Sequence, residues 1–368
     1  MNIQTIQQEN ISKSSVKTSR RPMVKFEQTK YCYYSGDNKE HWHLGPFSLE
    51  IFESELLVIL GPSGSGKTTL MRLIAGLESP RKGEISIDGQ MVFNGRVNVL
   101  PEKRQVGLMF QDHVLFPHLT VRENILFGIE DWSRSDRERR LLELKGLLRI
   151  GGYLKRYPHE LSGGQQQRVT LARTLAPKPK VILLDEPLSN IDADLRTSLA
   201  QELRDVIKQT GSTAVWVTHD QTEAFDIADR VAVLKDGNIE QLDTPLELYH
   251  NPNTRFVADF IGQSVFIEGE IQGEKILTEI GEIPNETPYD DGMKVEVMVR
   301  PDDVYVVPHD AGIGIVSKRQ FRGSQHLYTI TLPSGQDIYS HQSSTALWPV
   351  GGKVNVSLRS EHVVVFSI

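Results

Sequence analysis

The residues best suited to chemistry lie in a glycine-rich stretch at positions 61–68, which reads Gly-Pro-Ser-Gly-Ser-Gly-Lys-Thr. This order matches the pattern Gly-x-x-x-x-Gly-Lys-Ser/Thr of a phosphate-binding loop at every fixed position. Glycines allow successive backbone N–H groups to turn toward one anion, and a following helix adds partial positive charge at its start. Lys67 could then meet the β- and γ-phosphates of a nucleotide, and Thr68 could offer its hydroxyl to Mg²⁺.

The segments on either side of this stretch predict the elements that such a loop requires. Residues 56–60 form a short aliphatic run typical of a buried parallel strand, and residues 69–75 continue as a helix. Strand, loop and helix therefore follow in the required order, which makes a chance glycine-rich turn a poor alternative. The predicted nucleotide-binding residues here are Gly61, Pro62, Ser63, Gly64, Ser65, Gly66, Lys67, Thr68 and Thr69.

Polar side chains end three further predicted strands. Asp185 and Glu186 follow a run of four aliphatic residues, and Gln111 and His219 end two other apolar segments. If these strands neighbour the strand before the loop, their polar ends converge on the γ-phosphate. Catalysis of phosphoryl transfer consists mostly of positioning and charge stabilisation, which such convergence would supply. We expect Asp185 to hold the Mg²⁺ shell through water and Glu186 to act on the attacking water, although an isolated polar strand end is often only solvated.

The composition bounds the class of protein. A chain of 368 residues predicts two or three domains, and 39% hydrophobic with 24% charged residues is typical of a soluble globular protein. The net charge of −7 argues against a general nucleic-acid binder, and no stretch approaches the roughly 18 uncharged apolar residues of a membrane span. A single cysteine, Cys32, excludes an internal disulfide, and the N-terminus lacks the apolar core of a secretion signal. We therefore expect a cytoplasmic protein.

The residue pattern changes twice along the chain, near residues 22 and 262. Residues 1–22 are polar and predict a disordered tail. Strands then alternate with helices over residues 23–262, which predicts an α/β domain with a mainly parallel sheet and a helical subdomain at about 112–176. The predicted elements of this domain include strands at 24–34 and 47–51 and a helix from about 193 to 209. Short alternating segments over residues 263–368, such as 294–299, predict an all-β domain, with a small barrel as its architecture.

A second glycine motif, Leu-Ser-Gly-Gly-Gln at residues 161–165, opens a predicted helix. With the phosphate loop, Gln111, the Asp-Glu pair at 185–186 and His219 in this order, residues 24–260 resemble the ATP-binding subunits of ABC transporters. The resemblance implies an ABC-type P-loop NTPase that uses ATP and Mg²⁺. It implies that Gln111 senses Mg²⁺, together with Thr68 and Asp185 as metal-site residues, that Glu186 is the general base, and that His219 contacts the γ-phosphate.

The resemblance also implies partners. The motif residues Leu161, Ser162, Gly163, Gly164 and Gln165 would bind ATP held by a second copy of the chain, so hydrolysis would need a head-to-tail dimer with two composite sites. Two membrane permease subunits would dock on the segment at residues 115–120, and an extracytoplasmic substrate-binding protein would act indirectly. The protein would then lie peripherally on the cytoplasmic face of the cell membrane.

An aromatic ring after the first strand would stack on adenine in such a site. Tyr31, Tyr33 and Tyr34 all compete for this role, and we favour Tyr34, then Tyr33. That these tyrosines only fill the packing of the strand is an equal alternative.

Only short sequence resemblances indicate which substrate the transporter would carry. Residues 299–304, Val-Arg-Pro-Asp-Asp-Val, resemble the C-terminal regulatory domain of importer ATPases. Residues 156–161, 175–179, 189–192 and 254–260 look most like ferric-iron importers, although Asn190 departs from the wider family. Polyamine, sulfate or molybdate import is the alternative within transport. A soluble ABC ATPase of translation or DNA repair is the alternative outside it, but such proteins usually carry two cassettes or a long coiled-coil insertion.

Overall fold

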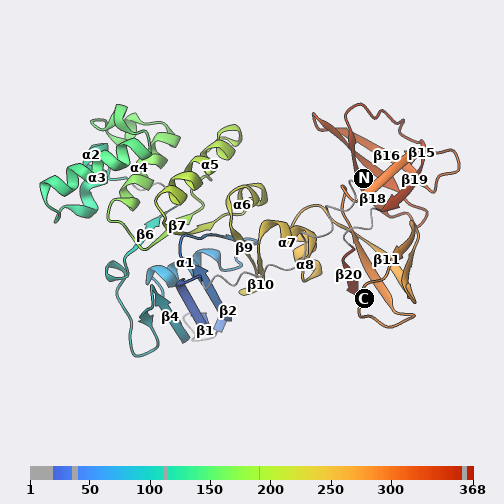
Figure 1. Cartoon of the computed structure of the whole chain (residues 1–368), viewed down its shortest axis with the longest axis horizontal. Helices are drawn as coiled ribbons and strands as arrows, with labels where there is room; N and C mark the ends of the chain where they lie inside the picture. The colour runs from blue at the N-terminus through green and yellow to red at the C-terminus, as the bar shows by residue number, and fades with distance from the viewer. Residues whose placement is uncertain (1–19, 35–39, 111–114, 190, 359–362) are drawn as a thin grey trace, which may run out of the picture. The chain divides into compact units, whose positions relative to one another are not determined.

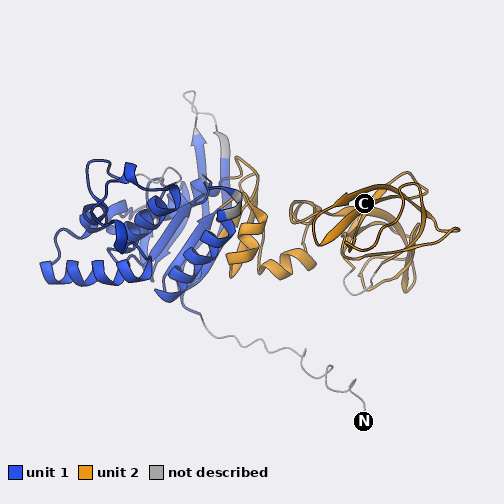
Figure 2. Ribbon diagram, turned by 90° about the horizontal axis from the view of Figure 1, so that it is seen from above, with its two compact units in different colours: residues 1–57, 66–217 blue, residues 58–65, 218–368 orange. Residues whose placement is uncertain are grey.

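The computed structural model of the chain describes residues 20–34, 40–110, 115–189, 191–358 and 363–368. The chain divides into two compact units, residues 1–57 with 66–217 (unit 1) and residues 58–65 with 218–368 (unit 2), shown in Figure 2. Most of the predicted N-terminal tail lies outside the described residues.

A four-stranded antiparallel sheet in the order β2-β1-β4-β5 forms one layer of unit 1. Its strands are β1 (Pro22–Tyr34), β2 (Glu40–Phe52), β4 (Lys82–Ile87) and β5 (Gln90–Phe93). The first two strands are longer than the sequence pattern predicted, which was residues 24–34 and 47–51. They extend because they pair along their whole length, from Pro22 opposite Phe52 to Tyr34 opposite Glu40, so backbone hydrogen bonds hold residues whose side chains carry no strand pattern.

A six-stranded sheet in the order β10-β9-β3-β8-β7-β6 carries the predicted parallel strands. Its strands are β3 (Leu56–Leu60), β6 (Val106–Met109), β7 (Val181–Asp185), β8 (Thr213–Val217), β9 (Arg230–Lys235) and β10 (Asn238–Asp243). In unit 1, β7 pairs in parallel with β6 and with β8. Parallel strands end at the same edge of a sheet, so the residues that follow them gather there.

Helices connect these strands. They are α1 (Lys67–Ala75), α2 (Val121–Leu126), α3 (Arg134–Leu147), α4 (Gly163–Leu175) and α5 (Ala193–Gln209) in unit 1, with α6 (Gln221–Ile227), α7 (Pro245–His250) and α8 (Arg255–Phe260) in unit 2. Short 3-10 turns fall at Pro101–Lys103, Phe127–Ile129, Gly151–Tyr153 and Pro158–Glu160.

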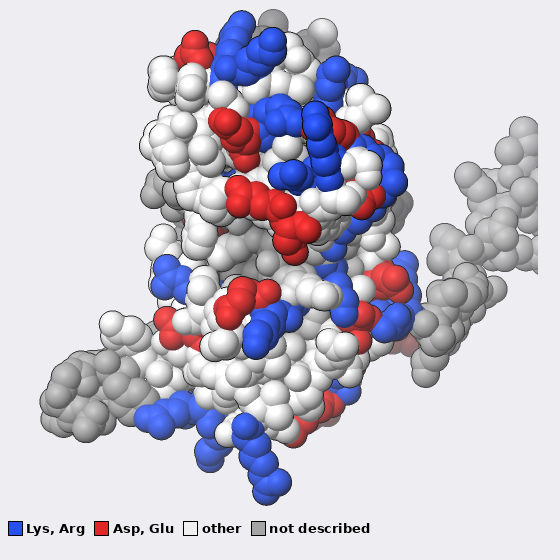
Figure 3. Space-filling view, turned by 90° about the vertical axis from the view of Figure 1, so that its left-hand side faces the viewer, with Lys and Arg blue, Asp and Glu red and all other residues white. Residues whose placement is uncertain are grey.

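Helices α2, α3 and α4 gather at one end of unit 1 (Figure 1). Arg139 and Asp136 form an exposed ion pair on α3. Figure 3 views this end and shows basic and acidic side chains interspersed over it. Such an exposed pair contributes little to stability. Arg140, in contrast, is mostly buried and donates to the oxygens of Leu175 and Ala176 at the end of α4, so these bonds and the buried Leu141 and Leu144 place α3.

The chain ends in two antiparallel five-stranded sheets, which confirms the predicted all-β region. One has the order β13-β12-β11-β14-β20 and the other β15-β19-β16-β17-β18. Their strands are β11 (Val265–Gln272), β12 (Lys275–Thr278), β13 (Gly281–Pro284), β14 (Lys294–Val299), β15 (Val304–Pro308), β16 (Gly314–Phe321), β17 (Gln325–Thr331), β18 (Asp337–Ser343), β19 (Lys353–Leu358) and β20 (Val365–Ser367).

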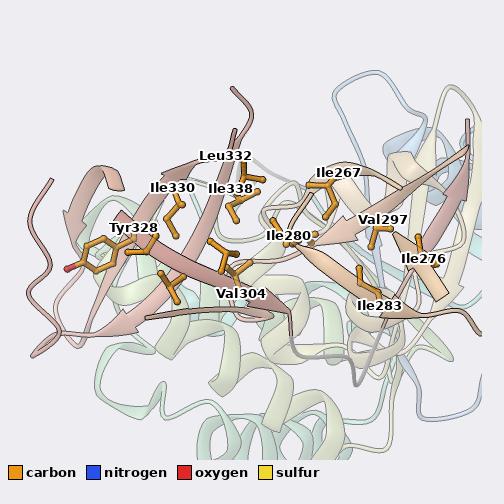
Figure 4. Packing of buried hydrophobic residues seen from close by; sticks show 14 of the residues in the cluster. Ile267, Ile276, Ile280, Ile283, Val297, Val304, Tyr328, Ile330, Leu332 and Ile338 are labelled. Carbon is orange, nitrogen blue, oxygen red and sulfur yellow. The ribbon is translucent and has the colours of Figure 1, made fainter. Parts of the chain in front are cut away.

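Both sheets contribute to one hydrophobic core (Figure 4). Ile267 and Val297 enter it from the first sheet, and Tyr328, Ile330 and Ile338 enter it from the second. A shared core of this kind gives the β region its own hydrophobic stabilisation. None of the helices described is long and apolar enough to cross a membrane.

Candidate functional site

The phosphate loop depends on glycine for two different reasons. A Cβ atom on Gly61 would lie 2.3 Å from the carbonyl oxygen of Leu234 on β9, so only glycine lets the two backbones approach. Gly64 and Gly66 have φ angles of 80° and 106°, in the left-handed region that other residues rarely adopt. The loop is further held by Gly237, whose N–H donates to the oxygen of Ser65 at 3.2 Å.

The loop and the start of α1 have the features of an anion site. The hydroxyl of Ser65 is buried and has no hydrogen-bond partner among the described residues. The described first turn of α1 holds no acidic residue, and Gly66 at its N-cap has no side chain to occupy the free N–H groups. These N–H groups and the helix dipole favour a negative charge at this position. The loop therefore fits a phosphate chain.

Lysine and two carboxylates meet at the first turn of α1. Lys67 is only 8% exposed, and this burial lowers its pKa below the usual range, while nearby Glu186 and Asp185 act in the opposite direction. Burial raises the pKa of Asp185, and the hydrogen bond that its Oδ1 accepts from Thr68 Oγ1 at 3.3 Å opposes this shift. The start of α1 and the end of β7 thus form one polar centre.

Hydroxyl and carboxylate oxygens are the ligands that Mg²⁺ takes in proteins, usually together with water and substrate phosphates. Thr68 and Asp185 supply one oxygen of each kind at this centre. Within the described part of the chain, no group of three or more His, Cys, Asp or Glu residues could hold a metal ion. The residues present therefore fit a metal ion held jointly with a nucleotide rather than by the protein alone.

Glu186 occupies a strained turn directly after β7. Its φ angle is 43°, a conformation that costs a residue with a side chain of order 1 kcal/mol or more. Two backbone bonds hold it there, from Glu186 N to the oxygen of Val217 at 3.0 Å and from Ser189 N to the oxygen of Glu186 at 3.2 Å. The turn changes the direction of the chain between the neighbouring carboxylates Asp185 and Glu186.

The second glycine motif begins helix α4. The N–H of Ser162 donates to Gln165 Oε1 at 3.1 Å, so Gln165 caps its own helix, and Leu161 is buried. A Cβ atom on Gly163 or Gly164 would meet, among described residues, only the tips of Ile191 and Leu199 at 3.5 Å. This is ordinary contact. Packing inside the subunit therefore does not require either glycine.

A pocket of about 480 Å³ opens beside this motif. Ser162, Gly163 and Gly164 form one wall, and Ile191 and Leu195 contribute to the other. Small residues at a helix N-terminus beside an open pocket leave room for a bulky anion. The motif is thus accessible from outside the subunit.

His219 lies on an exposed bend after β8. The residues beside it are fixed: Thr218 N donates to the oxygen of Ile59 at 3.2 Å, and Thr218 Oγ1 donates to Glu223 at 3.2 Å. Asp220 caps α6 by accepting from the N–H of Glu223. The backbone that carries the His219 imidazole is therefore anchored on both sides.

The three tyrosines differ in accessibility. Tyr31 is buried and donates to Glu78 at 3.0 Å; burial, then this bond, raises its pKa to about 12. Tyr33 is 61% exposed, which leaves its ring open to a ligand. The side chain of Tyr34 and the whole of Gln111 lie outside the described residues. Of the two described rings, Tyr33 is the available stacking surface.

Arg104 is a buried residue that sequence reasoning missed. Its guanidinium donates to the oxygens of Leu73 and Ile74 at 2.8 and 3.1 Å and to that of Val99 at 2.8 Å, so it caps the C-terminal end of α1. A lone arginine before a predicted strand carries no sequence signal for this role, because its partners are backbone carbonyl groups.

Comparison with known proteins gives two family matches. The profile described as ABC transporter matches residues 44–189, and the TOBE domain profile matches residues 297–366. Neither match depends on the geometry above.

Curated relatives match most of the chain. The "Fe(3+) ions import ATP-binding protein FbpC" of Streptomyces coelicolor is 42% identical over 88% of this chain and 92% of its own length. The "Spermidine/putrescine import ATP-binding protein PotA" of Ruegeria pomeroyi is 38% identical over 86% and 90%. The "Sulfate/thiosulfate import ATP-binding protein CysA" of Caulobacter vibrioides is 40% identical over 87% and 94%.

A solved structure is also similar. It is the dimeric post-hydrolysis state of the ATP-binding cassette MJ0796 bound to ADP and Pi, with a TM-score of 0.52 and 34% identity. The match covers 60% of this chain and 98% of that chain.

Proposed function

Because the chain belongs to the ABC transporter family, as an import ATPase with a C-terminal TOBE domain, we propose that it hydrolyses ATP to drive ferric iron through a membrane permease. The observation that carries the ATPase site is the meeting of Lys67 and Thr68 with Asp185 and Glu186. We assign residues 23–262 to nucleotide binding and hydrolysis, and residues 263–368 to a separate β-domain.

The phosphate chain of ATP lies, in this proposal, along residues 61–66, whose N–H groups surround it. Lys67 binds the β- and γ-phosphates, and its desolvated ammonium group gains strength as a phosphate ligand because little water competes with it. Thr68 and Asp185 would hold Mg²⁺, which would spread the negative charge of the phosphates. Tyr33, with Tyr34 as the other candidate, stacks on adenine.

Glu186 accepts a proton from the attacking water. The oxygen of that water bonds to the γ-phosphorus as the bond from this phosphorus to the bridging oxygen of ADP breaks, so ADP and inorganic phosphate leave. His219 donates a hydrogen bond to the γ-phosphate, and Gln111 contacts the metal site. General base catalysis of this kind contributes about 10²- to 10⁴-fold to a rate.

A second copy completes the site. Ser162, Gly163 and Gly164 would bind the γ-phosphate held by the opposite subunit, in a head-to-tail dimer. The room at these glycines supports this role, since the fold of the subunit does not use it. The similar MJ0796 cassette is described as dimeric with ADP and Pi bound, which is consistent with the same arrangement here.

Two permease subunits would dock on the helical end of unit 1, on the cytoplasmic face of the membrane. Phe116 packs on Phe127 with ring centroids 4.5 Å apart, and Phe127 remains 47% exposed. Arg173 lies 5.3 Å from the Phe116 ring centroid. An aromatic pair with one exposed ring is suited to receive an apolar segment of a partner. An external substrate-binding protein would deliver the cargo.

The choice of ferric iron rests on the short resemblances at residues 156–161, 175–179, 189–192 and 254–260 and on the 42% identity with the Fe(3+) relative. Polyamine and sulfate import are competing outcomes, because relatives with those names are almost as similar.

The test is uptake of labelled ferric iron, sulfate and spermidine by cells whose only copy carries Glu186→Gln. Loss of iron uptake alone would support the whole proposal. Loss of another cargo with normal iron uptake would reject iron and keep the import ATPase role. Normal uptake of all three would reject the role of Glu186 in these transport processes.

A further inference from the structure

Helix α4 carries a buried amide two residues beyond the second glycine motif. Gln167 is completely buried, and its Nε2 donates to the carbonyl oxygen of Pro187 at 3.0 Å. Pro187 follows Glu186 directly in the chain. The helix that begins at the motif is therefore bonded to the turn that carries the proposed general base.

This bond is one of a small set that holds the strained turn. Glu186 N bonds to Val217, the oxygen of Glu186 accepts from Ser189, and the oxygen of Leu188 accepts from Ile191 at 3.1 Å. The bond to Val217 comes from strand β8, and the other two join residues three positions apart within the turn. The bond from Gln167 is the one in this set that comes from α4. This bond restrains the peptide group of Pro187, next to Glu186, whose φ angle is positive.

A buried glutamine at this position has a cost that an apolar residue would avoid. The Oε1 atom of Gln167 has no hydrogen-bond partner among the described residues. Leaving a buried acceptor unpaired opposes folding, whereas methionine or leucine would fill similar space without that cost. The hydrogen bond to the oxygen of Pro187 is therefore what glutamine provides here and methionine or leucine does not.

We propose that Gln167 is a positioning residue, which couples α4 to the Glu186 turn and holds that turn in the geometry needed for hydrolysis. The inference rests on the proposed function, in which the start of α4 binds the ATP of the opposite subunit and Glu186 is the base. An α-helix rises 1.5 Å per residue, so Gln167 lies five steps, about 7.5 Å, along the helix axis from the N-cap Ser162. These first helical residues thus link contact at the glycine motif to the Glu186 turn.

The neighbouring residue provides a matched control. Gln166 also lies on α4, and its Nε2 donates to the oxygen of Pro158 at 2.9 Å and, at 3.5 Å, to that of Leu161. Neither acceptor belongs to the Glu186 turn. Gln166→Met and Gln167→Met thus remove the same kind of bond from the same helix, but only the second releases the turn.

The experiment compares Gln167→Met, Gln166→Met and Glu186→Gln in the purified full-length chain. Steady-state hydrolysis gives kcat and KM, and light scattering after size exclusion gives the ATP-dependent dimer. We expect Gln167→Met to lower kcat about 10- to 100-fold, as a small misplacement of a catalytic group does, with KM within about twofold of the wild-type value. The ATP-bound dimer should accumulate, as in Glu186→Gln. Gln166→Met should keep kcat within about threefold.

Two results would overturn the inference. One is wild-type kcat in Gln167→Met; the other is a fall in kcat that comes with loss of the dimer and equals that of Gln166→Met, since both indicate a role in helix stability alone. Gln167→Leu, measured beside Gln167→Met, must give the same phenotype and serves where the methionine variant does not fold. Wild-type hydrolysis by Glu186→Gln would instead reject the base assigned under the proposed function, whatever Gln167→Met does.

Discussion

Thr68 and Asp185 are 117 positions apart in the chain, yet Oγ1 of Thr68 donates to Oδ1 of Asp185 at 3.3 Å. This bond joins the first turn of the helix after the phosphate loop to the last residue of strand β7. In the proposed site, a metal-bound phosphate would lie at this point.

Replacing Glu186 by glutamine keeps the size of the side chain but removes the proposed base. We expect hydrolysis to fall by about 10²- to 10⁴-fold while the Kd for ATP stays within about threefold, because the change affects only the reacting water. Phosphate release and equilibrium binding of ATP measure the two effects. A parallel loss of binding would show that Glu186 supports the site rather than the reaction.

ATP binding at alkaline pH should take up a proton at Lys67. Burial lowers the pKa of this lysine, so part of the free protein carries it neutral at a pH where an exposed lysine is charged. The triphosphate adds negative charge and raises the pKa again, so affinity should fall as pH rises through the lowered pKa. Calorimetry in two buffers of different ionisation enthalpy measures the uptake. Lys67→Arg keeps the charge but cannot titrate, and should abolish the uptake.

The two glycine motifs should respond differently to alanine. Gly61→Ala places a Cβ atom 2.3 Å from a backbone oxygen of β9, which should cost about 1–3 kcal/mol and abolish ATP binding. Gly163→Ala meets only Ile191 at 3.5 Å, so thermal unfolding and ATP binding should stay normal while ATP-dependent dimerisation is lost. A normal dimer in Gly163→Ala would contradict the role of this glycine at the subunit interface.

Arg104→Met should destabilise unit 1. The change leaves three carbonyl groups at and near the end of α1 without their donor, which predicts a loss of roughly 3 kcal/mol. Arg104→Lys keeps the charge but not the planar set of donors and should give an intermediate value. Calorimetric scans of both variants measure the shift, and an unchanged first transition would argue against the cap.

Arg300→Met should loosen the junction between α8 and the β-domain. Arg300 is buried, donates from Nη1 to the oxygen of Ile261, and lies 3.9 Å from the centre of the Tyr249 ring. Loss of these contacts should raise the rate of proteolysis at residues 261–264 by about fivefold or more, because local opening governs cleavage.

Arg255→Met is the control for this junction. Arg255 also joins α8 to the β-domain, through an ion pair with Glu296 on β14 and a guanidinium 4.5 Å from the centre of the Phe266 ring. Its side chain is 58% exposed, and interactions of exposed charges contribute little to stability. Its proteolysis should stay close to that of the wild-type chain. Equal acceleration in both variants would mean that Arg300 has no special role.

Local sequence patterns predicted the strand, loop and helix around Lys67, and the strand that ends at Asp185. These elements could be predicted because each corresponds to one contiguous run of residues. The run is aliphatic for a buried strand and glycine-rich for a phosphate loop. The same reasoning predicted α5 at its observed bounds, 193–209, and β14 at 294–299. It underestimated β2, because the pairing of that strand depends on β1 and not on its own side chains.

By itself, the sequence determined which chemistry the chain can offer: a phosphate loop, a glycine motif that opens a helix, and polar residues after apolar strands. Only the tertiary structure decided that Thr68 meets Asp185, that Tyr31 is buried while Tyr33 is exposed, and that Gln167 and Arg104 bind distant backbone oxygens. The physical reason is that a carbonyl oxygen is the same in every residue. The side chain that bonds to a given carbonyl oxygen is therefore selected by how the chain folds, and it cannot be predicted from the residue types.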